Sequence, residues 1–166
     1  MKQMLLALSL VVLVTLVVAG CGKSAEMKKL EAAINTEVMD KHEAVMKLVP
    51  ELDSLTALIT TVTAKHDSLV KMYPTQTDGQ TAADLVAAQE KIAAAKAAMD
   101  VWMRGFKPYD ADAKHEGVLA GLNTQKDELV AIMKQFAEAR LAASDAIAAH
   151  QVAADKVLAQ MPKKKH

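Results

Sequence analysis

Three segments of the chain carry apolar residues at alternating intervals of three and four, and this spacing constrains the fold most strongly. Such a heptad seam lines one face of an α-helix that packs against other helices. In the first segment, with Lys41 and His66 filling two gaps, the seam is Ile34, Val38, Val45, Leu48, Leu52, Leu55, Ile59, Val62, Leu69 and Tyr73. In the second it is Leu85, Ala88, Ile92, Ala95, Met99, Trp102 and Phe106. In the third it is His115, Val118, Leu122, Gln125, Leu129, Ile132, Phe136, Ala139, Ala143, Ala146, His150, Ala153 and Val157.

Signals that start and stop helices lie at the ends of these seams. Ser24 and Asp112 are suitable N-caps, and Thr81 with Asp84 has the pattern of a capping box. Gly105 is a suitable C′ residue, and a proline follows each segment: Pro74, Pro108 and Pro162. We therefore predict helices over about 25–73, 81–104 and 113–161. The expected fold is all-α, an elongated antiparallel three-helix coiled-coil bundle over residues 25–161.

Pro50 lies inside the first predicted helix. A proline in a helix interior costs about 3 kcal/mol and usually kinks the helix. The seam keeps its phase across Pro50, with no glycine or polar turn nearby, which predicts one kinked helix. The alternative is a hairpin at Val49-Pro50, which would give four helices.

The composition excludes some classes of function. The chain holds 20 basic and 20 acidic residues, so no basic excess indicates a nucleic-acid partner. The short basic tail at 162–166 is interpreted as a solvated terminus. We find no phosphate-binding loop, dinucleotide fingerprint, HExxH motif or nucleophile elbow, and we therefore expect no enzyme activity.

The start of the chain has the three parts of an export signal. Lys2 precedes an apolar run of fifteen residues, Met4 to Val18, and Val18-Ala19-Gly20 leads to Cys21, the only cysteine. This pattern resembles the lipobox of bacterial lipoproteins. The resemblance implies a signal peptide at 1–20, a diacylglycerol thioether on Cys21, an acyl chain such as palmitate on the new amino terminus, and a lipidated linker at 21–24. The alternative is a transmembrane anchor, for which fifteen residues are short, since a span needs about 20.

The same resemblance indicates a location. Gly22, rather than aspartate, follows Cys21. By similarity to enterobacterial lipoproteins, this favours the outer membrane, with the protein facing the periplasm. The blocks Val38-Met39-Asp40-Lys41-His42-Glu43 and Met99-Asp100-Val101-Trp102-Met103 are also loosely similar to small all-helical lipoproteins of Bacteroidota, which carry no assigned activity.

Methionine and histidine recur on two of the predicted helices. Met39, His42 and Met46 share one helical face, and Met99 and Met103 share another beside Trp102. If tight turns join the helices, one end of the bundle gathers the candidate metal ligands His42, Met46, Met99, Met103 and His115, with Trp102 as a cation–π neighbour. Thioether and imidazole donors suit Cu(I) and, by extension, Ag(I). The alternative is that these residues only fill the core.

The same register predicts that His66 and His150 are far apart, each as a core or oligomer contact, with a pH switch as a further option. The second helix is too short to cover both partners, which predicts unpaired seams in the membrane-proximal half of the first helix and the distal half of the third. Such seams indicate self-association or docking to another helical envelope protein. The function expected first is a non-enzymatic, membrane-anchored periplasmic lipoprotein that acts through helix–helix contacts. The alternative is a protein that binds or delivers Cu(I) or Ag(I).

Overall fold

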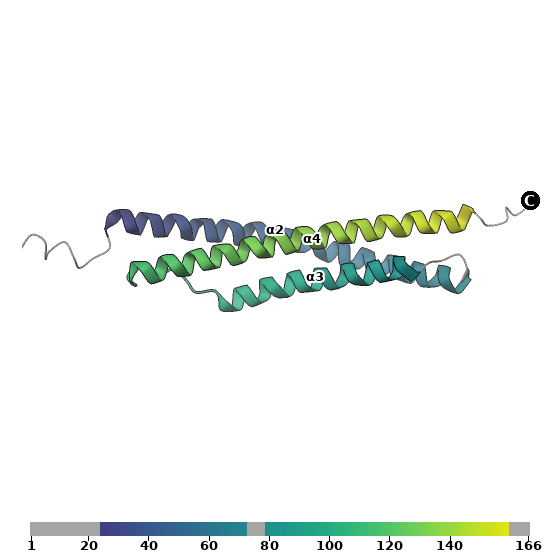
Figure 1. Cartoon of the computed structure of the whole chain (residues 1–166), viewed down its shortest axis with the longest axis horizontal. Helices are drawn as coiled ribbons and strands as arrows, with labels where there is room; N and C mark the ends of the chain where they lie inside the picture. The colour runs from purple at the N-terminus through teal and green to yellow at the C-terminus, as the bar shows by residue number, and fades with distance from the viewer. Residues whose placement is uncertain (1–23, 73–78, 160–166) are drawn as a thin grey trace, which may run out of the picture.

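The computed structural model describes residues 24–72 and 79–159, and these residues form three helices: α2 (Ala25–Met72), α3 (Gly79–Gly105) and α4 (His115–Ala159) (Figure 1). No strand occurs in these two ranges, and the prediction of an all-helical fold with three packed helices is confirmed. The predicted signal peptide, the predicted lipidation site Cys21 and the basic tail lie outside the described residues. None of the described helices combines the length and apolar character that a membrane crossing requires.

The bundle is elongated, and the chain runs along its long axis three times, reversing direction at each connection (Figure 1). The first turns of α2 and α4 therefore lie at the same end, and the last turns of these two helices lie at the other. α4 packs extensively against both α2 and α3, whereas α2 and α3 share a smaller interface. α2 and α4 thus form a parallel pair, with α3 antiparallel to both.

Helix α2 starts and continues as its sequence predicts. Ser24 caps it, because its Oγ accepts a hydrogen bond from the backbone N–H of Met27 at 3.2 Å. The helix then runs unbroken for 48 residues through Pro50, so the four-helix alternative is wrong. The hydroxyl of Ser54 donates to the Pro50 carbonyl at 2.9 Å, as helical serines often do.

Three predicted helix ends are wrong. α3 begins at Gly79, so Thr81 is a buried residue within the first turns and does not cap the helix. No described glycine has positive φ, and Gly105 is the last residue of α3 rather than a left-handed C′ residue. α4 begins at His115, while Asp112 lies in a turn where its N–H donates to Asp110 Oδ1 at 2.9 Å.

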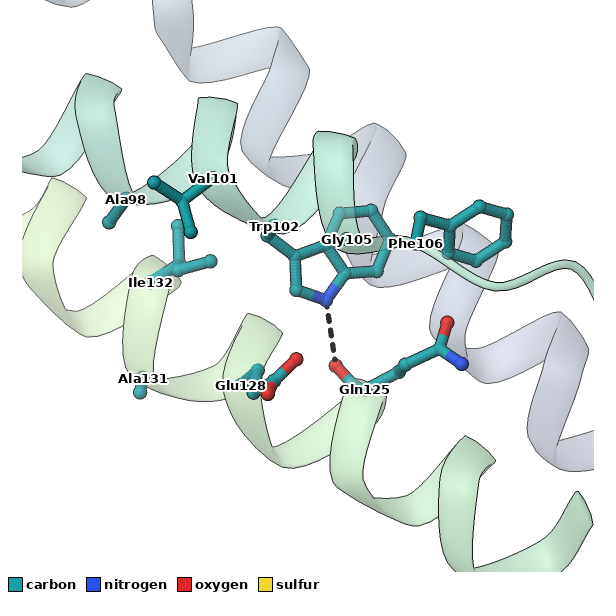
Figure 2. A pocket seen from close by; sticks show the side chains of 9 residues that line it. All are labelled: Ala98, Val101, Trp102, Gly105, Phe106, Gln125, Glu128, Ala131 and Ile132. Atoms are coloured by element: carbon teal, nitrogen blue, oxygen red, sulfur yellow. Dashed lines mark hydrogen bonds between the residues drawn. The ribbon is translucent and has the colours of Figure 1, made fainter. Parts of the chain in front are cut away.

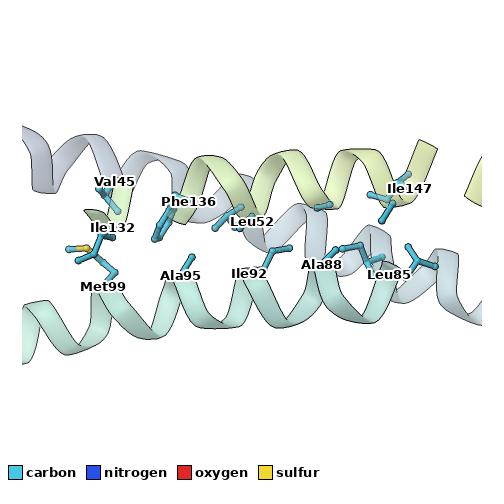
Figure 3. Packing of buried hydrophobic residues seen from close by; sticks show 14 of the residues in the cluster. Val45, Leu52, Leu85, Ala88, Ile92, Ala95, Met99, Ile132, Phe136 and Ile147 are labelled. Carbon is cyan, nitrogen blue, oxygen red and sulfur yellow. The ribbon is translucent and has the colours of Figure 1, made fainter. Parts of the chain in front are cut away.

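The heptad seams form the core. Every seventh residue of α2 from Val38 to Ile59 is almost completely buried, and alternating three- and four-residue steps are buried on α3 from Leu85 to Trp102. Phe136 is the largest of the fully buried side chains, and Figure 3 shows it pointing from α4 toward α3 near Ala95. Burying each such apolar side chain stabilises the fold by roughly 1.5–3 kcal/mol.

The connection between α3 and α4 sets an unexpected register. The segment 106–114 continues past the end of α3, so that α4 begins beside Glu31 near the start of α2, where His115 and Tyr109 both contact the Glu31 carboxylate. Glu31, Ile34 and Val38 are buried, and so are four seam residues of distal α4: Ala139, Ala143, Ala146 and His150. The prediction that these two half-helices are unpaired is therefore wrong, because it assumed a tight turn after α3.

Candidate functional site

Trp102 lies at the centre of the site that the sequence indicated. It occupies the last turn of α3, where its seam position turns the indole inward and leaves it almost completely buried. The indole N–H donates to the backbone carbonyl of Gln125 on α4 at 3.3 Å (Figure 2). This hydrogen bond satisfies the polar atom of the ring and fixes the ring between the helices.

Two aromatic rings flank the indole. The His42 imidazole from α2 stacks against it, with ring centroids 5.5 Å apart and planes 25° from parallel. The Phe106 ring lies 5.2 Å from it at an angle of 39°. Trp102 therefore joins α2, α3 and the start of the following connection in one cluster.

A small cavity of about 100 Å³ opens beside this cluster and is lined by Met39, His42, Trp102, Met103 and Phe106. Met39 is 42% exposed and Met103 is 39% exposed, so both side chains remain accessible from solvent. Two thioethers and one imidazole thus border one cavity at the edge of an indole. Soft d¹⁰ cations prefer such donors, and an indole face adds a cation–π attraction to a cation beside it.

Only part of the predicted ligand set lines this cavity. His42, Met103 and Trp102 do so, together with Met39, which the sequence placed on the same helical face but which was not among the predicted ligands. Met46 is exposed on α2 and is absent from the lining. Met99 is only 2% exposed and belongs to the hydrophobic core. Met99 therefore packs as the alternative interpretation stated.

His115 lies elsewhere, so its predicted position close to Trp102 is wrong. Its Nδ1 is 2.7 Å from Oε1 of Glu31, and the Tyr109 hydroxyl donates to Oε2 of the same carboxylate at 3.1 Å. Glu31 precedes His42 by eleven residues on one helix, a rise of roughly 16 Å. His115 and His42 therefore cannot share one ion in this arrangement.

The Glu31 cluster is itself a buried polar site. Burial, followed by the hydrogen bond to Glu31, raises the pKa of the Tyr109 hydroxyl, which keeps this hydroxyl protonated and donating. Glu31 is fully buried, and its two oxygens each contact a different segment. We interpret this cluster as a structural connection between α2, the 106–114 segment and α4.

A second and larger cavity lies on the other side of Trp102. It has a volume of about 470 Å³ and lies between α3 and α4, where Ala98, Val101 and Ile132 give it apolar walls (Figure 2). Glu128 lines it as well, and the nearby Gln125 Oε1 is buried with no hydrogen-bond partner. The Gln125 amide nitrogen instead donates to the Lys107 carbonyl at 3.2 Å.

In residues 24–72 and 79–159 no group of three or more histidine, cysteine, aspartate or glutamate side chains is arranged to hold a metal ion. Comparison of the chain with protein-family models, with curated proteins and with solved structures gives no match. Assignment of a function therefore rests on the chemistry of the residues themselves.

Proposed function

We propose that the protein is a non-enzymatic lipoprotein of the cell envelope that acts through helix–helix contacts. In this proposal Cys21 carries the lipid at the periplasmic face of the outer membrane, and the helices form a coiled coil with a kink at Pro50. The lipobox-like residues before Cys21 support the lipid anchor, and the long helices of the described bundle support a role in helix–helix contacts.

One surface feature carries this proposal. α4 has an exposed row on the side away from its core seam, which we call the outer row: Val130, Lys134, Ala137, Leu141, Ser144, Ala148 and Val152. Val130, Leu141 and Val152 are spaced by eleven residues, which is three helical turns, so they lie on one face. The row is apolar at every position except Lys134 and Ser144. An exposed, largely apolar row with helical spacing suits a further helix as a partner.

The pattern of the outer row favours a second copy of the same chain. Leu141 lies midway between Val130 and Val152, so an antiparallel pairing about Leu141 brings Val130 of one copy opposite Val152 of the other. A two-fold interface requires this kind of self-complementarity. Apart from Lys134, the remaining positions of the row are alanine and serine, whose small side chains allow the two helices to approach closely. In the pairing about Leu141, Lys134 of one copy lies opposite Ala148 of the other.

Sedimentation of the full chain in density-matched detergent tests this contact. We expect a dimer that dissociates on dilution, and we expect Leu141→Lys to be monomeric because it places a charge at the centre of the row. Val101→Lys on α3 is the matched control, since Val101 is also exposed but lies outside the row, and it should remain dimeric. A wild-type chain that is monomeric at the highest concentrations would exclude the second copy as the partner.

The anchor is tested separately. The chain purified from membranes should carry a diacylglycerol thioether on Cys21 and should begin at Cys21, as measured by mass spectrometry. Cys21→Ala should keep its signal peptide and lack the lipid. An unmodified Cys21 in a membrane-extracted chain would contradict lipidation.

The cavity beside Trp102 favours a second candidate function, the binding or delivery of Cu(I) or Ag(I). The donors are Met39, His42 and Met103, and the indole of Trp102 lies beside them. Saturable Cu(I) binding in competition with a chelator, with quenching of Trp102 fluorescence, would support it. The quenching of Trp102 fluorescence should be lost in Met39→Leu/Met103→Leu and retained in Met46→Leu, because Met46 does not line the cavity. Equal quenching of Trp102 fluorescence in both variants would exclude this site.

A further inference from the structure

Two buried histidines meet between α2 and α4, near the end of the bundle where α2 finishes. The rings of His66 and His150 have centroids 5.5 Å apart and planes at 64°. Their residues are only 3% and 4% exposed. This pair was not predicted, because the assumed turn between the second and third helices placed the two residues far apart.

One ring nitrogen of this pair lacks a partner. His150 Nε2 is buried and forms no hydrogen bond. Buried polar atoms of native proteins are almost always satisfied, so such an atom requires an explanation. An unpartnered neutral imidazole nitrogen presents a lone pair or an N–H that a bound group can satisfy.

The surroundings of His150 keep its imidazole neutral. Burial lowers its pKa most strongly, and the neighbouring His66 and Lys65 lower it further. Protons and metal ions compete for the same nitrogen lone pair. This lone pair is therefore free of a proton at neutral pH, and the charge of Lys65 acts against a bound cation as it acts against the proton.

The separation of the rings suits a shared ion. A metal ion bound to histidine lies about 2.0 Å from the nitrogen and therefore roughly 3 Å from the ring centre. Two imidazoles on one ion then have centroids about 5–6 Å apart, depending on the angle at the metal. The observed 5.5 Å corresponds to a bent arrangement at the ion, and a linear one, with about 6 Å between centroids, requires the two rings to move slightly apart.

The two histidine nitrogens of this pair favour an ion with a single positive charge. The pair supplies two neutral nitrogens, and no group of three or more histidine, cysteine or acidic residues surrounds it within the described ranges. Because the Born cost of burying an ion rises with the square of its charge, a monovalent ion is favoured over a divalent one at such a site. Cu(I) and Ag(I) are monovalent, accept two-coordinate geometry and bind imidazole.

We propose that His66 and His150 bind one Cu(I) or Ag(I) ion between them. An open cavity of about 770 Å³ lies beside His150 and is lined by His150, Lys65 and Ser68 among others, so an ion from solvent reaches the pair on the side of His150. His66 follows His42 by 24 residues on α2, a rise of roughly 36 Å, so this site is separate from the cavity at Trp102. It does not depend on either proposed function.

Silver titration of the full chain in detergent micelles, followed by ¹⁵N resonances of the histidine rings, tests the proposal. Ag(I) is the probe because it is diamagnetic and stable in air. The Met39→Leu/Met103→Leu background removes the donors at Trp102, so that any remaining binding reports on the histidine pair. We expect the ring nitrogens of His66 and His150 to shift together and to saturate at one ion per chain.

Two substitutions at one position separate ligation from packing. His150→Leu should abolish binding, whereas His150→Met should retain it, because methionine has a similar volume and supplies a thioether. Both should keep the helical circular dichroism spectrum. The proposal is overturned if Ag(I) leaves both histidine rings unshifted, or if the leucine and methionine variants bind equally well.

Discussion

His115 Nδ1 at the start of α4 lies 2.7 Å from the Oε1 atom of Glu31, 84 residues earlier near the start of α2. His66 and His150 have the same separation in sequence and also meet between these helices. Two polar contacts at opposite ends thus share one register, in which α2 and α4 run parallel. Because buried polar groups are stable only when paired, such contacts disfavour a shifted register.

The first prediction concerns Glu31. Glu31→Gln keeps the volume of the side chain but removes the charge that Tyr109 and His115 contact. We expect the free energy of unfolding in urea to fall by about 1–3 kcal/mol, the usual effect of weakening a buried hydrogen bond to a charged group. Glu37→Gln is the control, because its partner Lys126 is 3.5 Å away at an exposed site, and it should change stability by less than about 1 kcal/mol. Equal effects of the two substitutions would contradict a structural role for the Glu31 cluster.

The second prediction concerns pH. Burial, His66 and Lys65 hold the pKa of His150 below its ordinary value of 6.5, so the unfolded chain takes up this proton at a higher pH than the folded chain does. The contribution to stability is therefore complete above about pH 7 and decreases as the pH falls through 6.5 toward the folded-state pKa. The melting temperature should fall between pH 7.5 and pH 5. The decrease should be smaller in His150→Leu, and an unchanged pH dependence in that variant would contradict the prediction.

Much of the fold could be predicted because the heptad spacing is a local property. Val38, Val45 and Leu52 are buried at the positions that the seam assigns to them. Helix α2 continues through Pro50, as the unbroken heptad phase of the seam predicts. The connection 106–114 could not be predicted in the same way. Its extended path depends on contacts of Tyr109 and His115 with a residue far away in sequence, which no local pattern reports.

The candidate site was predicted only in part, because a helix face is a local property and the register between helices is not. His42, Trp102 and Met103 lie on α2 and α3 and line one cavity. The assumed register of these two helices was shifted, because it gathered Met46 at this site, where the structure places Met39. His115 was misplaced together with the whole register of α4. The histidine pair was detectable only as two histidines in heptad seams, a signal that gives no information on which seam position faces which.

The third prediction separates two methionines that lie one turn apart. Met99 is buried in the core, and Met103 borders the cavity at Trp102. We expect Met99→Ala to lower the free energy of unfolding by about 2–5 kcal/mol, since it leaves a cavity in the core. Met103→Ala should lower it by less, by about 1 kcal/mol, because Met103 is 39% exposed and already borders a cavity. Urea unfolding followed by circular dichroism measures both values, and a reversed order would contradict the placement of these residues.

The fourth prediction concerns Pro50, which removes one backbone hydrogen bond from the interior of α2. Pro50→Ala restores the N–H and should raise the free energy of unfolding by up to about 3 kcal/mol. Ser68→Ala in the same helix is the control, because Ser68 is exposed and its hydroxyl donates only to the Ala64 carbonyl one turn earlier. It should change stability by no more than about 0.5 kcal/mol. A destabilised Pro50→Ala chain would mean that the fold requires the distortion that proline introduces.

The last prediction tests why alanine occupies the distal seam of α4. Ala139 and Ala143 are fully buried, and Ala88 and Ala95 occupy the seam of α3. Small side chains on both helices allow their backbones to approach closely, so the core at this end has no room for a larger residue. Ala139→Leu should therefore lower the free energy of unfolding by about 1–3 kcal/mol, although leucine is more hydrophobic and almost as good a helix former. Ala149→Leu adds the same atoms at an exposed position of α4 and should lie within about 0.5 kcal/mol of the wild type. If Ala139→Leu instead stabilises the chain, the helices have space between them at this level, and close approach is not the reason for the alanines.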